Sequence, residues 1–277
     1  MKKMLSLALV LVLMMSLAAC GAKTETPAAT TAPAAAAETT AAAAETEAAA
    51  AEVSTIEAGK LIMSTNASFP PYEMIADDGS FEGIDVEVAD AIAKKLGLDL
   101  EVDDMDFDAA LLAVQQNKSD IVMAGVTVTD DRKLVMNFTD SYATGVQVVI
   151  VKEGSDVTLD NLGEKMIGTQ RGTTGYIFTS DDYGDDHVTA YDNGASAVQA
   201  LQNGQVDCVV IDAAPAEAYV EANPGLTILD TEYVVENYAI GVNKDNTALL
   251  DAINGALAEL TADGTIDTII GKYITAE

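Results

Sequence analysis

The sequence predicts an α/β fold in two lobes, each built on a largely parallel sheet. From about residue 59 onward, short apolar runs typical of buried strands alternate with amphipathic segments typical of helices. This globular part holds roughly 220 residues, enough for one large lobe or two small ones. A weak internal repeat favours two lobes, because residues 113–123 (AVQQNKSDIVM) are similar to residues 200–210 (ALQNGQVDCVV), with Asp120 aligned on Asp207. Chance similarity between two such units is the alternative.

Hydrophobic periodicity assigns the strands and helices of the first half. Ile84, Val88, Ile92 and Leu96 recur at every fourth position, which places them on one helix face, and Gly97 ends that helix. The other segments are a strand at 61–65 (LIMST), a strand at 100–105 (LEVDDM), a helix at 107–118 (FDAALLAVQQNK) and a strand at 120–125 (DIVMAG).

The same alternation resumes after about residue 164. In chain order, the segments are 165–169 (KMIGT), 173–180 (TTGYIFTS), 187–192 (HVTAYD), 195–204 (ASAVQALQNG), 206–212 (VDCVVID) and 214–223 (APAEAYVEAN). Near the end, Leu250, Ile253, Leu257 and Leu260 mark an amphipathic helix, and a shorter helix follows Gly264. Strands separated by helices pair mostly in parallel, so we expect one parallel sheet in each half.

The residues before the globular part predict export and a membrane anchor. Two lysines precede an apolar run too short to span a membrane, so residues 1–19 are typical of a secretory signal peptide. The run ends in LAAC, which resembles the lipobox of bacterial lipoproteins and implies lipid attachment to Cys20 after cleavage before it. An ordinary secreted protein with an incidental cysteine is the alternative. Residues 20–57 are rich in Ala, Thr, Glu and Pro, and we expect a disordered tether there.

Charge and residue usage exclude several kinds of partner and site. The chain has 45 acidic and 14 basic residues, and its net charge of −31 repels phosphate backbones, so we expect no nucleic acid partner. Cysteine and histidine spacing matches no zinc or haem motif, so we expect no metal and no cofactor. Cys208 lies in an apolar run and is expected in a buried strand. His187, the one histidine, is expected at the surface.

Two charged residues follow strands at equivalent places in the two halves. Arg132, one of only two arginines, follows the strand that ends near residue 125, and Asp212 ends the strand at 206–212. In open α/β sheets, ligands bind beyond the carboxyl ends of strands, so both side chains could face one cleft. The alternative for Arg132 is a surface ion pair with Asp130 or Asp131. For Asp212 it is a helix N-cap, and that role is compatible with ligand binding.

From about residue 60 the chain resembles the family-3 extracellular solute-binding proteins, which deliver polar amino acids to ABC importers. The stretches that carry the resemblance are STNASFPPYE, GSFEGIDVEVADAIAKKLG, AGVTVTDDRKLVMNFTDSY, GTQRGTTGY, LQNGQVDCVVIDAAPA and ALAELTADGTIDTIIGKY. The resemblance implies a two-lobed, periplasmic-binding-protein-like fold of type II, with a ligand cleft between the lobes and two crossing hinge segments. We expect crossings near 148–151 and 238–242, lobe 1 at 58–149 and 239–277, and lobe 2 at 150–238.

The resemblance also implies which residues hold the charged ends of the ligand. Arg132, in the segment TDDR, matches an arginine that binds the α-carboxylate, and a guanidinium suits this role because its planar fork pairs with a carboxylate at two points. Asp212 matches an acceptor for the α-ammonium group. Contacts with one or other of these groups are further implied for Thr127, Thr174, Ala124 and Gly125. Arg171, the other arginine, either admits an acidic ligand side chain or faces solvent.

Further matches lie around the ligand's side chain. Phe69 and Phe107 match residues that sandwich the ligand, and ordinary core packing is the alternative for both. Asn66 and Gln170 match positions near the side chain, and their neutral amides favour a polar, uncharged ligand over a dibasic one. Tyr72 is expected to support the site rather than to line it.

The function implied is transport rather than catalysis. We expect a monomeric, lipid-anchored protein on the extracytoplasmic face of the membrane, which hands an amino acid to an ABC permease with its ATPase. The alternatives are a dehydratase of amino-acid precursors on the same fold and a ligand-sensing lipoprotein without transport. An enzyme would need a general acid or base in the cleft, and no Ser-His-Asp, Cys-His or paired-Glu pattern stands out.

Overall fold

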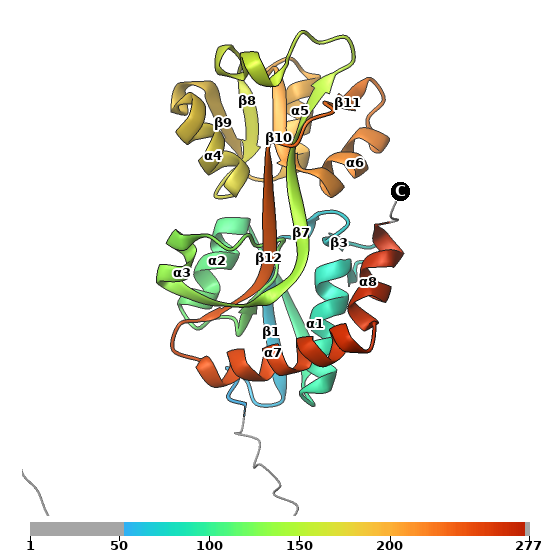
Figure 1. The fold of residues 1–277 in the computed structure, drawn as a ribbon. Coiled ribbons are helices and arrows are strands. Elements are labelled where there is room, and N and C mark those ends of the chain that lie inside the picture. Colours follow the sequence, from blue (N-terminus) through green and yellow to red (C-terminus); the bar gives the residue numbers. More distant parts are fainter. Residues whose placement is uncertain (1–52, 275–277) are drawn as a thin grey trace, which may run out of the picture. The chain divides into compact units, whose positions relative to one another are not determined.

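Residues 53–274 are described by the computed structural model. The predicted signal peptide, Cys20 and most of the predicted tether therefore lie outside the described residues. Within that range, no helix combines the length and the apolar character needed to cross a membrane. Figure 1 shows two lobes, each with helices around a sheet, that are joined by two long neighbouring strands.

Lobe 1 is formed from both ends of the described chain. In its sheet, β1 (Lys60–Thr65) pairs in parallel with β5 (Asp99–Asp104) on one side and β6 (Ile121–Val122) on the other. Its helices are α1 (Ile84–Lys95), α2 (Phe107–Gln115), α3 (Asp130–Val135), α7 (Thr247–Ala262) and α8 (Thr265–Tyr273).

Two apolar clusters cover the two faces of this sheet. Successive side chains of a strand point to opposite faces, so β1 directs Leu61 and Met63 to the cluster that α1, α7 and α8 share. On the other face, α2 packs Phe107 and Leu111 against Val122. Burial of these faces fixes the register of the strands, and with it the edge at which their carboxyl ends meet.

Lobe 2 repeats the same arrangement with the middle of the chain. Its sheet places β8 (Ile167–Gln170) between β9 (Val188–Tyr191) and β10 (Cys208–Asp212), all in parallel. The helices are α4 (Thr174–Tyr183), α5 (Gly194–Gln202) and α6 (Ala213–Ala222), with short 3-10 helices at Leu159–Glu164 and Asp185–His187. Cys208 is fully buried in β10, as predicted. The predicted two-lobed α/β fold is confirmed.

The internal repeat has a structural counterpart in its aligned aspartates. Asp120 accepts a hydrogen bond of 2.9 Å from the backbone N–H of Ile62 in β1. Asp207 accepts one of 2.8 Å from the N–H of Met166, immediately before β8. Each aspartate therefore ties the same helix–turn–strand unit to the strand beside it in the sheet, β1 in lobe 1 and β8 in lobe 2.

The two lobes are connected by β7 (Met136–Lys152) and β12 (Val234–Asn243), which pair antiparallel along their length. At one end β12 pairs with β6 of lobe 1, and at the other β7 pairs with β10 of lobe 2. The strands therefore pass from one sheet into the other (Figure 1). Both crossings expected from the sequence, 148–151 and 238–242, fall within these strands. Residues 147–151 already pair with β10, so the chain changes lobe before them in β7.

Several short elements were not predicted. A small antiparallel sheet consists of β2 (Ser68–Phe69), β3 (Glu73–Ile75) and β4 (Phe81–Glu82), while β11 (Leu226–Ile228) pairs with β7.

The ordered fold also starts earlier than residue 58. The backbone N–H of Ile56 donates to Asp120 at 2.8 Å, and the carbonyl of Ser54 accepts from Asn246 at 2.9 Å. The globular part therefore includes residues expected to lie in the tether.

Candidate functional site

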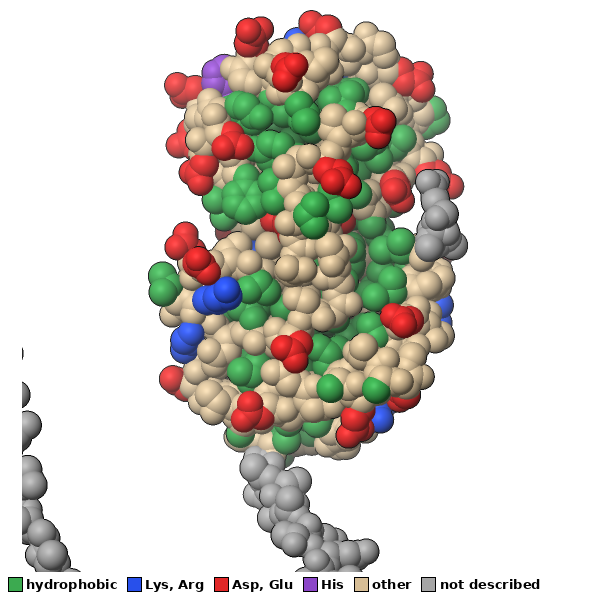
Figure 2. Space-filling model, viewed as in Figure 1, with side chains coloured by type: hydrophobic (Ala, Val, Ile, Leu, Met, Phe, Trp, Pro, Cys, Tyr) green, Lys and Arg blue, Asp and Glu red, His purple; other side chains and the backbone are tan. Residues whose placement is uncertain are grey.

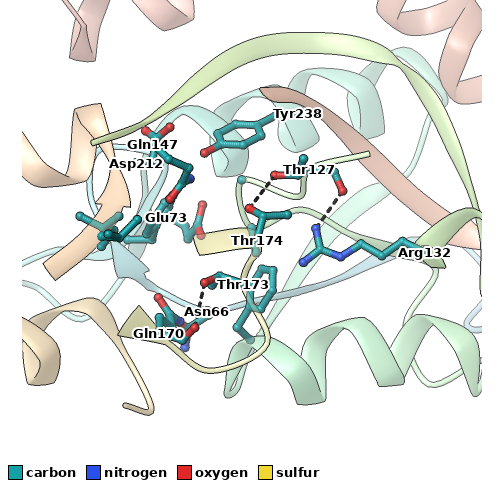
Figure 3. Close-up of a pocket in the computed structure, with 16 residues that line it drawn as sticks. Asn66, Glu73, Thr127, Arg132, Gln147, Gln170, Thr173, Thr174, Asp212 and Tyr238 are labelled. Atoms are coloured by element: carbon teal, nitrogen blue, oxygen red, sulfur yellow. Dashed lines mark hydrogen bonds between the residues drawn. The ribbon is translucent and has the colours of Figure 1, made fainter. Parts of the chain in front are cut away.

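Sixteen residues line a pocket between the two lobes (Figure 3). Its atom-free space, including the opening, is about 450 Å³. The lining includes all ten residues predicted to bind a ligand, namely Asn66, Phe69, Phe107, Ala124, Gly125, Thr127, Arg132, Gln170, Thr174 and Asp212. The structure thus brings these side chains together, while their roles toward a ligand remain predictions.

Arg132 enters the pocket from the start of α3. The hydroxyl of Thr129 caps this helix by accepting the backbone N–H of Arg132 at 3.2 Å, so the spacing in TDDR fixes where the arginine stands. Its guanidinium donates to the carbonyl of Thr127 at 2.8 Å and to that of Gly172 at 3.1 Å. The central carbon of the guanidinium lies 5.4 Å from the ring centroid of Phe107. Carbonyls and a ring therefore hold the side chain in one orientation.

The guanidinium of Arg132 is buried without a paired anion in the described range 53–274. Its side chain makes no ion pair with Asp130 or Asp131, and Asp130 pairs with Lys133 instead. The surface ion pair considered from the sequence is therefore wrong. Burial lowers the pKa of Arg132 to about 10, a value at which the group still carries its charge at neutral pH. A buried cation of this kind favours an anionic ligand group.

Asp212 approaches the pocket from the other lobe, at the end of β10. Its carboxylate caps α6 by accepting the N–H of Ala214 at 3.2 Å, and it accepts the N–H of Val146 in β7 at 2.9 Å. Burial raises the pKa of Asp212 to about 6, against the opposing effect of Tyr238 and the two backbone donors. The N-cap role and a place in the pocket coexist, and the carboxylate is suited to accept a cationic ligand group.

Hydrogen bonds across the pocket hold the lobes together. The amide of Gln170 donates to Asn66 at 3.0 Å, and the hydroxyl of Tyr219 donates to the carbonyl of Ser68 at 2.7 Å. Thr127 and Thr174 face each other at 3.5 Å (Figure 3). Arg132 adds its bond to Gly172 of lobe 2. These contacts join lobe 1 directly to lobe 2 beside the pocket.

Six lining residues were missed by the sequence analysis, namely Glu73, Gln147, Thr173, Val210, Ile211 and Tyr238. Thr173 and Ile211 adjoin predicted residues, so a wider window around each motif would have included them. Gln147 and Tyr238 lie on the two connecting strands, whose course the periodicity did not define. Glu73 follows Tyr72 in the motif PPYE, and nothing in its sequence spacing marks it as buried.

Other residues singled out from the sequence lie outside the pocket lining. Tyr72 is buried behind it, stacked on Phe69 with ring centroids 5.8 Å apart and edge-on to Tyr238 at 5.3 Å. Arg171 is exposed, 3.8 Å from Asp192, so of its two alternatives the structure places it toward solvent. His187 is half-buried beside the carbonyl of Lys165, at 3.3 Å.

The lining of the pocket carries opposite charges on its two sides. Within the described part of the chain, no group of three or more His, Cys, Asp and Glu side chains is arranged to hold a metal ion. Figure 3 shows Arg132 on one side and Asp212 with Glu73 on the other. An amino acid zwitterion carries opposite charges that match Arg132 and Asp212, and each buried charge would be stabilised by its opposite.

The raised carboxyl pKa values predict that the protein without ligand gains stability on mild acidification. Burial raises the pKa of Asp212 and of Asp85 from 3.8 to about 6, so the folded state takes up protons at a higher pH than the unfolded chain. Their stabilising contribution is complete below about pH 4 and is lost as the pH rises through 6. Between pH 7 and pH 5, these two groups should contribute a gain of about 1 to 3 kcal/mol to the free energy of unfolding, measured by chemical denaturation. Asp212→Asn should show a smaller gain, and equal gains in both proteins would contradict the assignment.

Comparisons with known proteins agree with this geometry. A model of the bacterial extracellular solute-binding proteins, family 3, matches residues 61–276. A probable histidine-binding protein of Neisseria gonorrhoeae is 34% identical over 222 residues, which cover 78% of this chain and 83% of that protein.

Solved structures of similar proteins extend the comparison. An ancestral arginine-binding protein bound to glutamine is 40% identical, with a TM-score of 0.75, and covers 79% of this chain and 99% of its own. The arginine-, lysine-, histidine-binding protein ArtJ from Geobacillus stearothermophilus is 32% identical, with a TM-score of 0.75. The match covers 79% of this chain and 96% of ArtJ. With the family model matching most of its length, this chain belongs to the bacterial extracellular solute-binding proteins of family 3.

Proposed function

We propose that this protein is the substrate-binding component of an amino acid ABC importer. It traps a zwitterionic amino acid between its lobes and delivers it to a permease with its ATPase. The observation that carries the proposal is the pair of buried, opposite charges, Arg132 from lobe 1 and Asp212 from lobe 2, on opposite sides of one pocket.

Binding energy and lobe closure are coupled in this arrangement. The ligand's α-carboxylate pairs with Arg132, and Thr127 and Thr174 contribute hydroxyls from the two lobes. The α-ammonium group pairs with Asp212. A ligand that contacts both lobes binds the closed state better than the open one, and it shifts the population toward closure by that difference in affinity. The permease could then distinguish the loaded protein by its closed form.

The ligand is an L-amino acid with an extended side chain. In support, the similar proteins are named for histidine, arginine and lysine, and one is bound to glutamine. Phe69 and Phe107 from lobe 1 contribute rings to the pocket, where they can pack against the aliphatic part of such a side chain.

The protein acts outside the cytoplasm, attached to the membrane by lipid on Cys20, as a monomer and without catalysis. The family of extracellular proteins to which it belongs supports the location. The signal peptide and the LAAC sequence support the lipid. A spacer of about 30 residues between Cys20 and the globular part would let the lobes reach the permease. Figure 2 shows acidic side chains spread over one face of both lobes, which keep this domain from anionic headgroups.

A thermal-shift screen of residues 21–277, which lack the proposed lipidation site Cys20, against the twenty amino acids tests the proposal. A true ligand at ~100 times its dissociation constant should stabilise the fold by roughly 2.7 kcal/mol. We expect shifts for a few L-amino acids and none for their D-enantiomers, because the latter cannot place both charges and the side chain together. Absence of any shift among L-amino acids would contradict the proposed function.

A further inference from the structure

Asp85 is a buried acid that lies outside the lining of the pocket but bonds to a residue that lines it. Its side chain comes from the first turn of α1 and is fully buried. One carboxylate oxygen accepts the backbone N–H of Gly125 at 2.9 Å, and the other accepts the hydroxyl of Tyr142 at 2.7 Å. Gly125 lines the pocket, whereas Tyr142 belongs to the connecting strand β7. One side chain therefore joins the pocket to the connection between the lobes.

The start of α1 fixes the position of Asp85 by close backbone contact. The backbone N–H of Asp85 donates to the carbonyl of Tyr72 at 2.9 Å. Gly83, immediately before the helix, has a φ of 126°, and a β-carbon there would stand 2.3 Å from the carbonyl oxygen of Tyr72. Glycine is therefore required at this place, and it allows the first turn of the helix to press against the neighbouring backbone.

The pocket loop, residues 124–128, is held at two places. Near its start it is held by Asp85, and further along Thr127 forms an antiparallel bridge with Tyr238 of β12. The carbonyl of Thr127 also accepts a hydrogen bond from the guanidinium of Arg132. A shift of the pocket loop would therefore move an acceptor that orients Arg132.

Tyr142 marks an irregular place in β7. The residues on either side of it pair with the consecutive residues Tyr238 and Ala239 of β12, so Tyr142 is the extra residue of a β-bulge. Bulges bend a strand and redirect a side chain. This bulge precedes residues 147–151, which pair with β10 of lobe 2. Through Tyr142, Asp85 therefore holds the bend in β7 to lobe 1.

The ionised carboxylate of Asp85 is costly to the fold. Burial raises the pKa of Asp85 to about 6, against the opposing hydrogen bonds of Gly125, Tyr142 and Glu73. A neutral side chain at this place would cost less to bury. The benefit of the carboxylate lies in the groups that it holds in place.

We propose that Asp85 is a positioning residue for ligand binding, which couples the pocket loop to the bend between the lobes. This inference rests on the proposed function, since it concerns the same pocket. Asp85 acts from behind the lining. It keeps the pocket loop where Thr127 and Arg132 can meet a carboxylate, and it keeps β7 on lobe 1 where the strand bends. Without Asp85, a smaller fraction of the free protein is ready to bind, and the apparent affinity falls by the same factor.

Titration calorimetry of residues 21–277 with L-arginine tests this inference, at about pH 8, where Asp85 is ionised. Asp85→Ala should weaken binding about 10- to 100-fold. Asp85→Asn should remain within about fivefold of the unmodified protein, because its oxygen can accept from Gly125 and its amide can donate to the hydroxyl of Tyr142. Unchanged affinity in Asp85→Ala would overturn the role of Asp85 while the proposed function stands.

The same helix supplies a matched control. Tyr273 donates its hydroxyl to Glu87 of α1, also at 2.7 Å, away from the pocket lining. Tyr273→Phe removes this tyrosine–carboxylate bond and should leave the affinity unchanged within about twofold. All titrations are made well below the melting temperatures, so a loss of stability alone does not change the affinity. An equal loss in Tyr273→Phe and Asp85→Ala would overturn the inference.

A double variant tests the coupling, with a single change that keeps the packing of the ring. Tyr142→Phe should weaken L-arginine binding about 3- to 10-fold. Adding Tyr142→Phe to Asp85→Ala should cause no further loss beyond about twofold, because both changes remove the same contact. Losses that multiply, or full affinity in Tyr142→Phe alone, would overturn the coupling between the pocket loop and the bend.

Hydrogen exchange of the free protein, followed by mass spectrometry, gives a measurement that needs no ligand. Peptides that contain the pocket loop should exchange faster in Asp85→Ala and unchanged in Tyr273→Phe. Equal exchange in Asp85→Ala and the unmodified protein would show that Asp85 does not hold the loop. If the unmodified protein binds no amino acid although the exchange differs as expected, the proposed function is overturned, and the role of Asp85 in binding with it.

Discussion

Replacement of Arg132 by alanine should reduce the affinity for any α-amino acid at least about 30-fold, because the ligand's carboxylate would lose its paired cation in a buried site. The loss should be similar for every amino acid that binds, since the α-carboxylate is common to all. Titration calorimetry on residues 21–277 measures it. Arg132→Lys keeps a charge but not the fork that reaches the carbonyls of Thr127 and Gly172. Its affinity should therefore lie between those of the unmodified protein and Arg132→Ala.

The chain supplies a matched control for this experiment. Arg171 is the only other arginine, and it is exposed beside Asp192. Arg171→Ala removes the same charge and should leave ligand affinity unchanged within about twofold. Equal losses in both variants would show that net charge, rather than the position of Arg132, controls binding. Far-UV circular dichroism on each variant confirms that the fold is retained.

Gly145→Ala should abolish detectable amino acid binding. Gly145 lies in β7, and a β-carbon added there would stand 2.4 Å from an Asp212 oxygen and 2.5 Å from the Tyr238 hydroxyl. Both neighbours are buried and cannot retreat into solvent, so Asp212 leaves the position in which it would meet the α-ammonium group. Overpacking of this kind costs about 1 to 3 kcal/mol, which lowers the melting temperature by several degrees.

Gly255→Ala provides the comparison. Gly255 lies in α7, where an added β-carbon meets no atom within 4 Å, and alanine is the better helix former. This variant should bind as the unmodified protein does and melt at the same or a higher temperature. A Gly145→Ala protein with unchanged affinity would contradict the position assigned to Asp212.

The principal charges of the site could be predicted from the sequence because local features position them. Thr129 caps α3 three residues before Arg132, and Asp212 caps α6 at the end of a buried strand. Asp212 ends a strand and Arg132 follows one in an alternating α/β pattern, and the regions beyond the carboxyl ends of strands are where ligands bind in such folds. The role of each toward a ligand still depends on experiment.

Glu73 could not be predicted because its environment is entirely tertiary. Burial, and then the charge of Asp85 in α1, raise the pKa of Glu73, and tyrosines from β7 and α6 lie near it although they are far from it along the chain. Hydrophobic periodicity in the short strand β3 gives no signal for such burial. The sequence analysis likewise did not predict how long β7 and β12 are, since the pairing partners of these strands change along their length.

The two neutral amides near the ligand's side chain are less informative than the sequence analysis took them to be. The neutral amides of Asn66 and Gln170 favoured an uncharged ligand. In the structure, however, Gln170 donates to Asn66, and Asn66 donates to the carbonyl of Met105 at 2.8 Å. Amides that satisfy each other say little about the charge of the ligand.

The claim that the pocket reads an amino acid zwitterion is tested most directly by comparing L-arginine with agmatine, which has the same side chain and amine but no α-carboxylate. Calorimetric titration of residues 21–277 with each ligand gives the ratio of dissociation constants. The account predicts that agmatine binds at least about 100-fold more weakly, because the guanidinium of Arg132 is left buried and unpaired. Agmatine binding within threefold of L-arginine would contradict it.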